Sequence, residues 1–492
     1  MKILVTGGTG LVGTSLVAEL LRQGHKVRLV SRHASQGARL FDGPVESIDA
    51  DVASADEIRG TAEACDVIFH NAGIVSEPAG GPSFEEVNVR GTQNIVREAE
   101  RAGVRRFVYI SSLNADKGNS NYHQSKLKGE EVTATFSREW VITRPSVVYG
   151  PGDEVVSLLL KMVRTLSAVP VIEGGDQLSQ PIWAADLAKA LAMCVDRPDV
   201  IGETLLLAGP EKVSMNQMLD KLCNLVGKHP VRVPMPGWMA EMGLSFVQRV
   251  GVDLPFSQDQ IVMLQEGNML YGDEENALTE RFHISLVPLD QRLMELTQSV
   301  PVTEPSTGVG KLRHLKLEGA IRGSGFNARQ VFAIISSQLP TLFSNSPVTA
   351  GSAPVVLQEG TTLDLALPLR GLCQVRVADL NETSCVLLTV EGHPLNGAVK
   401  FEVTDKSDSE VKITIDTFSR SANMIDAAVM NGIGQVAQEL TWHKVMGNIG
   451  QVVGGELEEV NRSIEEPEPG EASEVEAWLK ELALKSRRQF LL

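Results

Sequence analysis

The sequence has little that would tie the protein to nucleic acid, to a membrane or to an oxidising compartment. Its formal net charge is −17 at pH 7, which disfavours a nucleic-acid partner because phosphate binding needs an excess of Lys and Arg. No apolar run reaches the roughly 20 residues of a membrane-spanning helix. The cysteines form no CxxC pair, so we expect no disulfide framework and no metal site. We expect all five to be buried: Cys65, Cys194, Cys223, Cys373 and Cys385.

The first residues predict a strand rather than a leader. Met1–Val5 lacks the cationic segment and following apolar region of a secretory signal. We therefore expect a cytoplasmic protein without a transmembrane segment. A chain of 492 residues is too long to fold around one ordinary hydrophobic core, so we expect two or three units.

Residues 1–300 alternate short apolar runs with amphipathic stretches, which predicts an α/β fold with a doubly wound parallel sheet. The expected strands are Ile3–Val5, Val27–Val30, Val67–Phe69, Phe107–Ile110 and Val141–Thr143. The expected helices are Leu11–Gln23, Val155–Val169, Asp186–Val195 and Met215–Val226. Pro234–Gly251 is rich in Met, Trp and Phe, which is compatible with core packing or with a lining for an apolar substrate.

Residues 301–310 have the Pro, Ser and Thr content of a linker, and residues 311–465 predict an α+β domain. Its expected strands are Leu363–Leu367, Cys373–Leu380, Cys385–Val390, Val399–Thr404 and Val411–Phe418, with helices at 328–342 and 423–446. Residues 466–492 complete the chain. The acidic, Pro-rich Glu465–Gly470 is typical of disorder, and Val475–Phe490 predicts an amphipathic helix.

A glycine-rich loop, Thr6-Gly7-Gly8-Thr9-Gly10-Leu11-Val12-Gly13, joins the first strand to the first helix. Gly7 allows the tight turn, Gly10 allows a pyrophosphate to approach, and Gly13 allows close packing of helix on strand. The N–H groups at the start of the helix then face the anion. A strand before the loop and a helix after it make this pattern specific for a dinucleotide.

The end of the second strand bears on the choice between NADP and NAD. A carboxylate there would bind the ribose 2′-hydroxyl of NAD, but this sequence has Ser31-Arg32-His33. Arg32 can pair with the 2′-phosphate of NADP, with no carboxylate to repel it. We therefore predict NADP, while NAD remains the alternative if Arg32 is only a solvated surface charge.

Tyr122 and Lys126 stand four residues apart, on one face of a predicted helix. A nearby ammonium lowers the pKa of a tyrosine, whose phenol can then exchange a proton with a carbonyl or alcohol oxygen. Ser111 and Ser112 directly follow a predicted strand, and a hydroxyl at that point can bind the same oxygen.

Together these motifs resemble the short-chain dehydrogenase/reductase superfamily in its extended or atypical branch. The resemblance covers residues 1 to about 300 and is closest to the subgroup of the NADPH-binding accessory subunit of respiratory complex I. Its further motifs are Asp51-Val52, Asn71-Ala72-Gly73, Asn88-Val89-Arg90-Gly91-Thr92, Arg144-Pro145-Ser146-Val147-Val148-Tyr149-Gly150-Pro151-Gly152 and Asp186.

The resemblance implies a role for each matching residue. Tyr122 would be the acid/base, Lys126 its pKa modulator and a ribose ligand, Ser112 the residue that orients the substrate, and Asn88 a structural and proton-relay residue. The implied cofactor-binding set is Gly7, Thr9, Gly10, Leu11, Val12, Gly13, Arg32, Asp51, Val52, Asn71, Ala72, Gly73, Tyr122, Lys126 and Pro145. The family's nucleotide-sugar enzymes usually have a much longer segment than Leu113–Asn121 between Ser112 and the tyrosine, which counts against a nucleotide-sugar substrate.

The second domain carries Gly392-His393-Pro394, then Gly397 and Phe401, and later Phe418-Ser419-Arg420. These residues resemble a domain family of unknown function that is related to START/polyketide-cyclase-like helix-grip folds. The resemblance implies an antiparallel sheet curled around a long helix, often with an apolar cavity. His393 and Arg420 are polar candidates for a ligand site, although a plain turn histidine is the preferred interpretation of His393.

The leading hypothesis is an NADP-dependent oxidoreductase that acts on a small or apolar carbonyl or alcohol through Ser112, Tyr122 and Lys126. An epimerase, dehydratase or isomerase that retains its cofactor is one alternative. A non-catalytic, cofactor-binding structural or regulatory subunit is another. The sequence does not identify the substrate, and it leaves homo-oligomer formation open.

Overall fold

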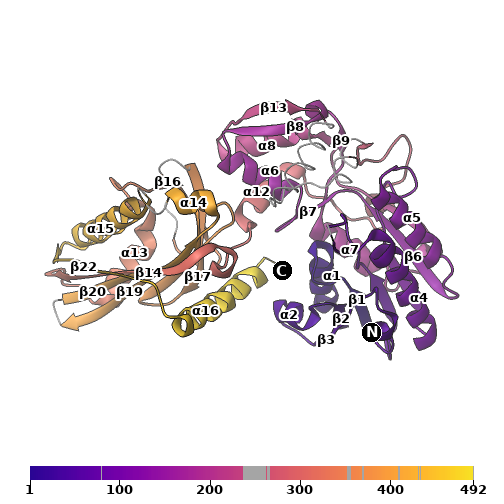
Figure 1. Ribbon diagram of the computed structural model, residues 1–492, viewed down its shortest axis with the longest axis horizontal. Helices are drawn as coiled ribbons and strands as arrows, with labels where there is room; N and C mark the ends of the chain where they lie inside the picture. Colours follow the sequence, from indigo (N-terminus) through magenta and orange to yellow (C-terminus); the bar gives the residue numbers. More distant parts are fainter. Residues whose placement is uncertain are drawn as a thin grey trace. The chain divides into compact units, whose positions relative to one another are not determined.

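The computed structural model describes residues 1–78, 80–236, 262, 266–351, 356–367, 371–407, 410–429, 432 and 434–490. The chain divides into two compact units, Met1–Thr297 and Gln298–Phe490 (Figure 1). Among the helices of these ranges, none combines the length and apolar content that a bilayer span requires. All five cysteines are buried, as predicted.

The N-terminal unit is built on a seven-stranded parallel sheet in the order β11-β6-β5-β4-β1-β2-β3. The strands are β1 Lys2–Thr6, β2 Lys26–Ser31, β3 Val45–Asp49, β4 Val67–His70, β5 Arg106–Ile110, β6 Glu139–Pro145 and β11 Thr204–Leu207. The strand order reverses between β1 and β4, where doubly wound sheets bind ligands. The predicted fold class is therefore confirmed. Strands β3 and β11 were not predicted, and three of the five residues of β3 are exposed.

Helices cover both faces of this sheet, because its central strands β1, β4 and β5 are largely apolar and buried. Ile3 and Val5 of β1 share a core with Leu16 and other residues of α1. Leu4 points to the opposite face and packs with Ile95 of α4. The helices are α1 Leu11–Arg22, α2 Ala34–Gly37, α3 Ala55–Ile58, α4 Gly91–Ala102, α5 Asn121–Thr133 and α7 Ala184–Met193.

A smaller lobe of the same unit is formed mainly by residues after β6. Its helices are α6 Val156–Thr165, α8 Met215–Val226, α11 Ala277–Glu280 and α12 Leu289–Ser299. Short strand pairs join β7 Val148–Tyr149 to β10 Ile182–Trp183, β8 Ala168–Ile172 to β13 Val231–Met235, and β9 Leu178–Ser179 to β12 Val213–Ser214. The helix predicted to reach Val169 ends at Thr165, because Ala168 already begins β8. Most of the Met- and Trp-rich Pro234–Gly251 lies outside the described residues.

The second unit is α+β, as predicted, with an antiparallel nine-stranded sheet. The strand order is β15-β16-β17-β18-β19-β20-β14-β21, and β22 also pairs with β14. The strands are β14 Val309–Arg322, β15 Thr349–Ala350, β16 Thr362–Leu367, β17 Gly371–Leu380, β18 Ser384–Thr389, β19 Leu395–Ser407, β20 Glu410–Ser421, β21 Glu456–Leu457 and β22 Asn461–Glu465. The helices are α13 Ala328–Leu342, α14 Met424–Val429, α15 Gln435–Val452 and α16 Pro469–Arg488.

Helices α13 and α15 pack on this sheet through one apolar core. Phe332 and Ile335 of α13 and Val445 of α15 share it with Leu317 and Phe401 of the sheet. The single helix predicted over 423–446 is divided between α14 and α15. The five predicted strands correspond to β16 to β20, whereas β14, β15, β21 and β22 were not predicted. A relation to START-like domains stays a prediction.

Both predicted connecting segments belong to the second unit. The predicted linker lies against β18, since the Thr303 amide donates to the Thr389 carbonyl at 2.8 Å and the Glu391 amide donates to Pro301 at 2.9 Å. Glu465–Gly470, predicted to be disordered, closes β22 and begins α16, where Pro469 suits the first turn. The predicted tail helix is present as α16, whose Leu479 is buried and whose Glu476 pairs with Arg420.

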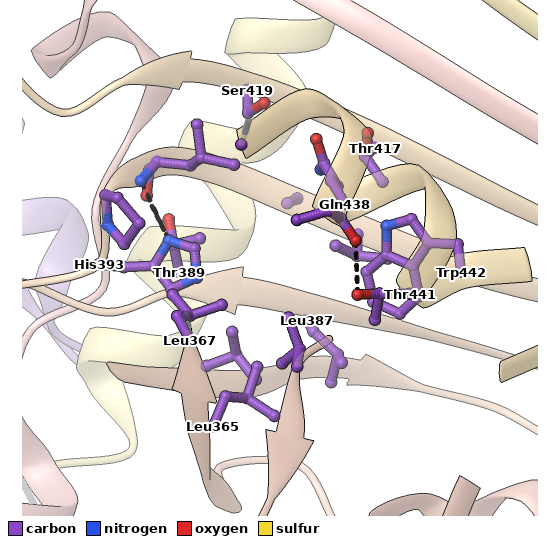
Figure 2. A pocket seen from close by; sticks show the side chains of 18 of the residues that line it. Leu365, Leu367, Leu387, Thr389, His393, Thr417, Ser419, Gln438, Thr441 and Trp442 are labelled. Atoms are coloured by element: carbon purple, nitrogen blue, oxygen red, sulfur yellow. Dashed lines mark hydrogen bonds between the residues drawn. The ribbon is translucent and has the colours of Figure 1, made fainter. Parts of the chain in front are cut away.

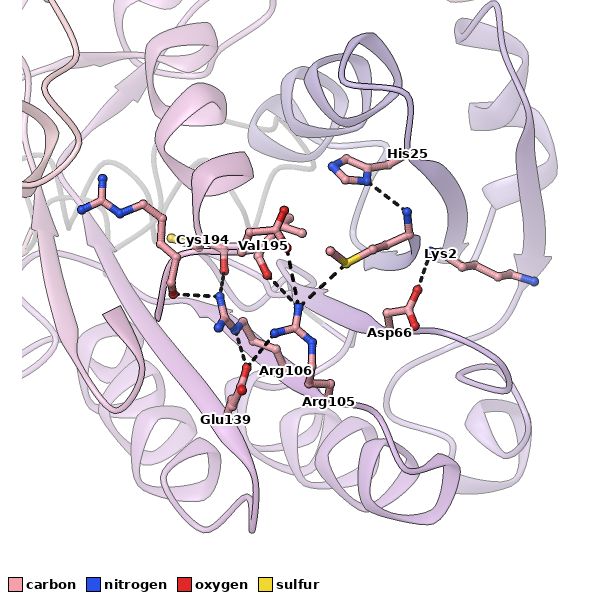
Figure 3. Close-up of polar contacts among 11 residues, drawn as sticks. Lys2, His25, Asp66, Arg105, Arg106, Glu139, Cys194 and Val195 are labelled. Atoms are coloured by element: carbon pink, nitrogen blue, oxygen red, sulfur yellow. Dashed lines mark hydrogen bonds and ion pairs between the residues drawn. The ribbon is translucent and has the colours of Figure 1, made fainter. Parts of the chain in front are cut away.

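A buried arginine joins the amino-terminal edge of the parallel sheet to the end of α7. Arg106 is 1% exposed, and its Nη1 donates to the carbonyls of Cys194 at 2.6 Å and Arg197 at 3.0 Å (Figure 3). Its Nε donates to Glu139 Oε2 at 2.9 Å. The neighbouring Arg105 also binds Glu139, but 42% of its side chain is exposed.

We expect Arg106→Met to lower the free energy of unfolding of the N-terminal unit by about 3 kcal/mol, because two buried carbonyls lose their donor. Arg105→Met is the matched control and should cost less than about 1 kcal/mol, since an exposed ion pair contributes little. Urea unfolding followed by tryptophan fluorescence measures both. Equal losses for the two variants would contradict this role of Arg106.

Candidate functional site

The glycine loop lies at the carboxyl end of β1 and depends on very close backbone contacts. Gly7 has φ +65°, and its amide donates to Val30 at 3.2 Å. A Cβ on Gly13 would lie 2.2 Å from the Gly7 carbonyl oxygen, so only glycine fits there. Helix α1 begins after the exposed Gly10, which has no side-chain cap. Its first N–H groups, beside Thr9, Leu11 and Val12, are thus available to an anion such as a pyrophosphate.

The segment after β4 lies directly against this loop. Asn71 Nδ2 donates to the Gly7 carbonyl at 3.1 Å, and the Ala72 amide donates to Thr6 Oγ1 at 3.2 Å. A Cβ on Gly73 would lie 3.9 Å from Lys126 Nζ. The predicted cofactor-binding segments and the predicted catalytic lysine therefore meet in one place.

Asn88 holds this segment to α5. It is 1% exposed and lies in a π-helical turn, Glu85–Arg90. Its Oδ1 accepts from the Ile74 amide at 2.8 Å, while Nδ2 donates to the Ile74 carbonyl at 3.0 Å and to Ser125 Oγ at 2.9 Å. These three bonds engage both the amide oxygen and the amide nitrogen of Asn88 within the protein. In this structure Asn88 therefore positions the segment around Ile74 against α5.

Ser112 and Tyr122 lie close together. The short segment between them is compact, with the Ala115 amide donating to Ser112 at 3.0 Å and the Gly118 amide donating to Asn114 at 2.7 Å. The Ser112 hydroxyl is near enough to the Tyr122 phenol to lower the pKa of that phenol. The nine-residue spacing is therefore enough to bring the two hydroxyls together.

Ser111, the less favoured serine, is occupied elsewhere. Its hydroxyl donates to the buried Glu130. Arg144 Nε and Nη2 donate to the same carboxylate at 2.9 and 2.7 Å. The structure thus leaves Ser112 as the serine that faces Tyr122.

Burial controls the charges of Tyr122 and Lys126. Burial raises the pKa of Tyr122 to about 12, and the hydrogen bond with Ser112 only partly opposes this. Burial lowers the pKa of Lys126 to about 7, against the opposing charge of Glu130. Lys126 Nζ donates to the Ile110 carbonyl at 2.6 Å and lies 4.4 Å from the centre of the Tyr109 ring. The expected lowering of the Tyr122 pKa by Lys126 is therefore absent here, because desolvation dominates for both groups.

The remaining predicted cofactor residues lie at the carboxyl ends of neighbouring strands. Arg32 is exposed and directly follows β2. Asp51 and the buried Val52 follow β3, and the Val52 carbonyl accepts from Asn94 at 2.9 Å. Pro145 ends β6, where its carbonyl accepts from the Leu113 amide at 2.9 Å.

The end of β2 carries no carboxylate, but the neighbouring strand β3, which was not predicted, ends in one. Asp49 ends β3 opposite Ser31. Its carboxylate accepts from the Ser35 amide at 2.8 Å and from the Ser35 hydroxyl at 2.7 Å. These bonds lower the pKa of Asp49 and direct its charge toward the start of α2.

The sequence analysis missed two further groups. Glu266 Oε2 lies 3.0 Å from Nδ1 of His123, the neighbour of Tyr122, and no local pattern links positions so distant in the chain. A cavity of about 90 Å³ lies in the smaller lobe, lined mostly by apolar side chains such as Val147, Leu159, Met215 and Met218.

In the second unit, His393 fits the predicted turn histidine, since its Nδ1 lies 3.1 Å from both the amide and the carbonyl of Leu395. Arg420 Nη1 donates to the Gly310 carbonyl at 2.7 Å, and Nη2 binds Glu476 of α16. Arg420 therefore joins chain segments within the second unit in this structure.

Comparisons with known proteins match the two units separately. Residues 3–208 match the model of the NAD dependent epimerase/dehydratase family, and residues 331–448 match a domain of unknown function, DUF1990. The chain is 28% identical over 253 residues to NADH dehydrogenase (ubiquinone) 1 alpha subcomplex subunit 9, mitochondrial, of Rattus norvegicus, which covers 49% of this chain and 67% of the rat protein.

Two other relatives are enzymes by name. UDP-glucose 4-epimerase of Vibrio cholerae is 27% identical over 266 residues, covering 48% of this chain and 79% of its own. The 3 beta-hydroxysteroid dehydrogenase/Delta 5-->4-isomerase of Mycobacterium tuberculosis is 34% identical over 184 residues, covering 32% and 49%. A solved UDP-glucuronic acid 4-epimerase of Bacillus cereus has a TM-score of 0.49 at 19% identity, covering 61% of this chain and 98% of its own.

The buried Lys126 predicts a pH dependence of stability in the cofactor-free protein. Its pKa falls from 10.5 to about 7 on folding, so the unfolded chain binds more protons between these values. The free energy of unfolding should therefore rise with pH across this window, by up to about 1.4 kcal/mol per pH unit from this group. Lys126→Met should remove this contribution.

Urea unfolding at several pH values between 7 and 10 gives the free energy of unfolding of wild type and of Lys126→Met, and so the pH dependence of each. Lys128→Met, at a position 57% exposed in the same helix, is the control and should keep the wild-type slope. Parallel pH profiles for wild type and Lys126→Met would show that Lys126 is not buried in its neutral form.

Proposed function

Because residues 3–208 match the model of the NAD dependent epimerase/dehydratase family, we propose that the chain is an NADP-dependent oxidoreductase acting on a small or apolar carbonyl compound. The observation that carries the proposal is the proximity of Ser112 to Tyr122, one helical turn before the buried Lys126. The family match and the enzymes among the relatives support an NAD(P)-dependent oxidoreductase or epimerase.

The residues at the edge of the parallel sheet fit a dinucleotide. The N–H groups at the start of α1 suit the pyrophosphate, Asn71–Gly73 border the same space, and Lys126 suits the nicotinamide ribose. When bound there, the reduced nicotinamide would supply a hydride for the carbonyl carbon. Ser112 donates a hydrogen bond to the carbonyl oxygen, and Tyr122 transfers its phenolic proton to that oxygen, so the product is an alcohol.

The ionisation of Tyr122 bears on the direction of the reaction. With its pKa raised to about 12, the phenol is protonated at neutral pH and can act as an acid without prior proton uptake. A protonated acid suits carbonyl reduction better than alcohol oxidation, which needs the phenolate.

One alternative has its own support. The similarity to the rat NADH dehydrogenase subunit and the bond from Lys126 Nζ to the Ile110 carbonyl, which ties the ammonium to the backbone, favour a cofactor-binding subunit without turnover. The second alternative is an epimerase with retained cofactor, which the similarity to the Vibrio cholerae enzyme supports.

Two observations would distinguish these alternatives. Cofactor that stays bound through purification, without net redox turnover, would favour the epimerase. Co-purification in a stable heteromeric complex would favour the subunit.

We expect the protein to bind NADP more tightly than NAD. Arg32→Ala should weaken NADP binding by about tenfold or more, because a charge-assisted hydrogen bond to the 2′-phosphate is lost, and should leave NAD binding unchanged. Isothermal titration calorimetry measures all four affinities. Lys26→Ala, at the exposed opposite end of β2, is the control and should change neither affinity. Equal affinities of the wild type for the two cofactors would exclude the proposed role of Arg32.

We expect Tyr122→Phe to reduce turnover of apolar aldehydes and ketones by at least about 100-fold, since the general acid is removed. The NADPH dissociation constant should change by less than about threefold, because the ring is retained. Consumption of NADPH by a panel of such carbonyls measures turnover. Tyr271→Phe, at a tyrosine that is 42% exposed, should keep the activity. Full activity of Tyr122→Phe would rule out the mechanism.

A further inference from the structure

The second unit contains a cavity of about 340 Å³ between its sheet and its helices (Figure 2). Protein interiors seldom leave voids larger than a water molecule, whereas this volume of liquid water would hold about ten molecules. It falls within the range of roughly 300–1,000 Å³ that is usual for small-molecule sites. The size therefore indicates a binding site rather than a packing defect.

The walls of the cavity are mainly aliphatic. Leu363, Leu365 and Leu367 line it from β16 at every second position, so all three side chains project from one face of the strand. Leu387 of β18 and Val399 of β19 extend this apolar surface across the sheet. A molecule that fills this space must be largely hydrocarbon.

The charges of the lining argue against an ionised ligand. Among the described residues that line the cavity there is no Lys and no Arg. The lining carboxylate is Asp426, which is 3% exposed and accepts from Asn423 Nδ2 at 2.7 Å. The lining histidine, His393, has its Nδ1 3.1 Å from the backbone of Leu395. A fatty acid or phosphate would therefore place an anion here with no Lys or Arg partner, at a high desolvation cost.

One buried donor in the wall lacks an acceptor. Trp442 of α15 is 7% exposed and lines the cavity, and its indole N–H has no hydrogen-bond partner in the described part of the structure. The ring itself is held in place by edge contacts with Phe401, at 5.4 Å between centroids, and Phe343, at 5.8 Å. A buried N–H usually has a partner. Less than 1 Å² of this nitrogen is accessible in the structure, so a ligand oxygen would reach it once neighbouring side chains move aside.

We propose that this cavity binds one neutral, largely hydrocarbon molecule with a single oxygen acceptor, of the long-chain alcohol or ketone class. The aliphatic walls take the chain, and the indole N–H of Trp442 binds the oxygen. The proposal concerns the second unit alone and does not depend on the proposed function of the N-terminal unit.

The test uses the full-length protein and the neutral dye Nile red, with hexadecan-1-ol and hexadecanoate as competitors. We expect saturable binding of one dye per chain and displacement by the alcohol at a concentration at least about tenfold lower than by the carboxylate. Binding without saturation, or equal displacement by the two competitors, would overturn the proposed ligand class.

Three variants locate the site. Val399→Trp fills the cavity and should weaken dye and alcohol binding by at least about tenfold, while Thr404→Trp adds the same bulk at an exposed position of β19 and should change nothing. Trp442→Phe keeps the ring and should weaken binding of the alcohol by about fivefold. Thermal unfolding checks that each variant is folded, and Leu367→Phe replaces Val399→Trp if that variant is not. Unchanged binding in the folded cavity variant refutes the site, and unchanged alcohol affinity in Trp442→Phe refutes the assigned donor.

Discussion

Close backbone contact at the carboxyl edge of the parallel sheet is the constraint on which the N-terminal unit depends. The Gly7 carbonyl, the start of α1 and the Ala72 amide approach so closely that a Cβ on Gly7 would lie 2.7 Å from Ala72 N. This contact places Asn71–Gly73 beside the glycine loop, and Asn88 then connects the following residue, Ile74, to α5. The tyrosine and lysine on α5 are thereby held near the space that a dinucleotide occupies in such folds.

The sequence allowed much of this unit to be predicted because its signals are local. Apolar runs, the glycine loop and the four-residue step from Tyr122 to Lys126 each lie within a few consecutive positions. The ionisation of the site could not be predicted in this way. It depends on burial by the whole fold and on partners distant in the chain, such as Glu130 with Arg144 and Glu266 with His123.

In the second unit, five strands were predicted from their apolar content, whereas β14 was missed. Leu315 and Leu317 alternate there with charged residues, and this alternation is typical of a strand with one solvent-exposed face. Composition misled at Glu465–Gly470, because an acidic, Pro-rich segment also suits a strand end and the first turn of a helix. The cavity could not be predicted from the sequence, because the aliphatic residues that line it have the same sequence pattern as residues of a filled hydrophobic core.

The long strand β14 has a consequence for how the protein is made. It pairs along most of its length with β20, and over His314–Glu318 with β22, both far later in the chain. During synthesis the N-terminal sheet can form once β11 has left the ribosome, but β14 must wait until Glu410–Ser421 has been made before it can pair with β20. A newly made chain should therefore carry a finished first unit while β14 still exposes unpaired backbone, which makes this strand the point where chaperones would be most needed.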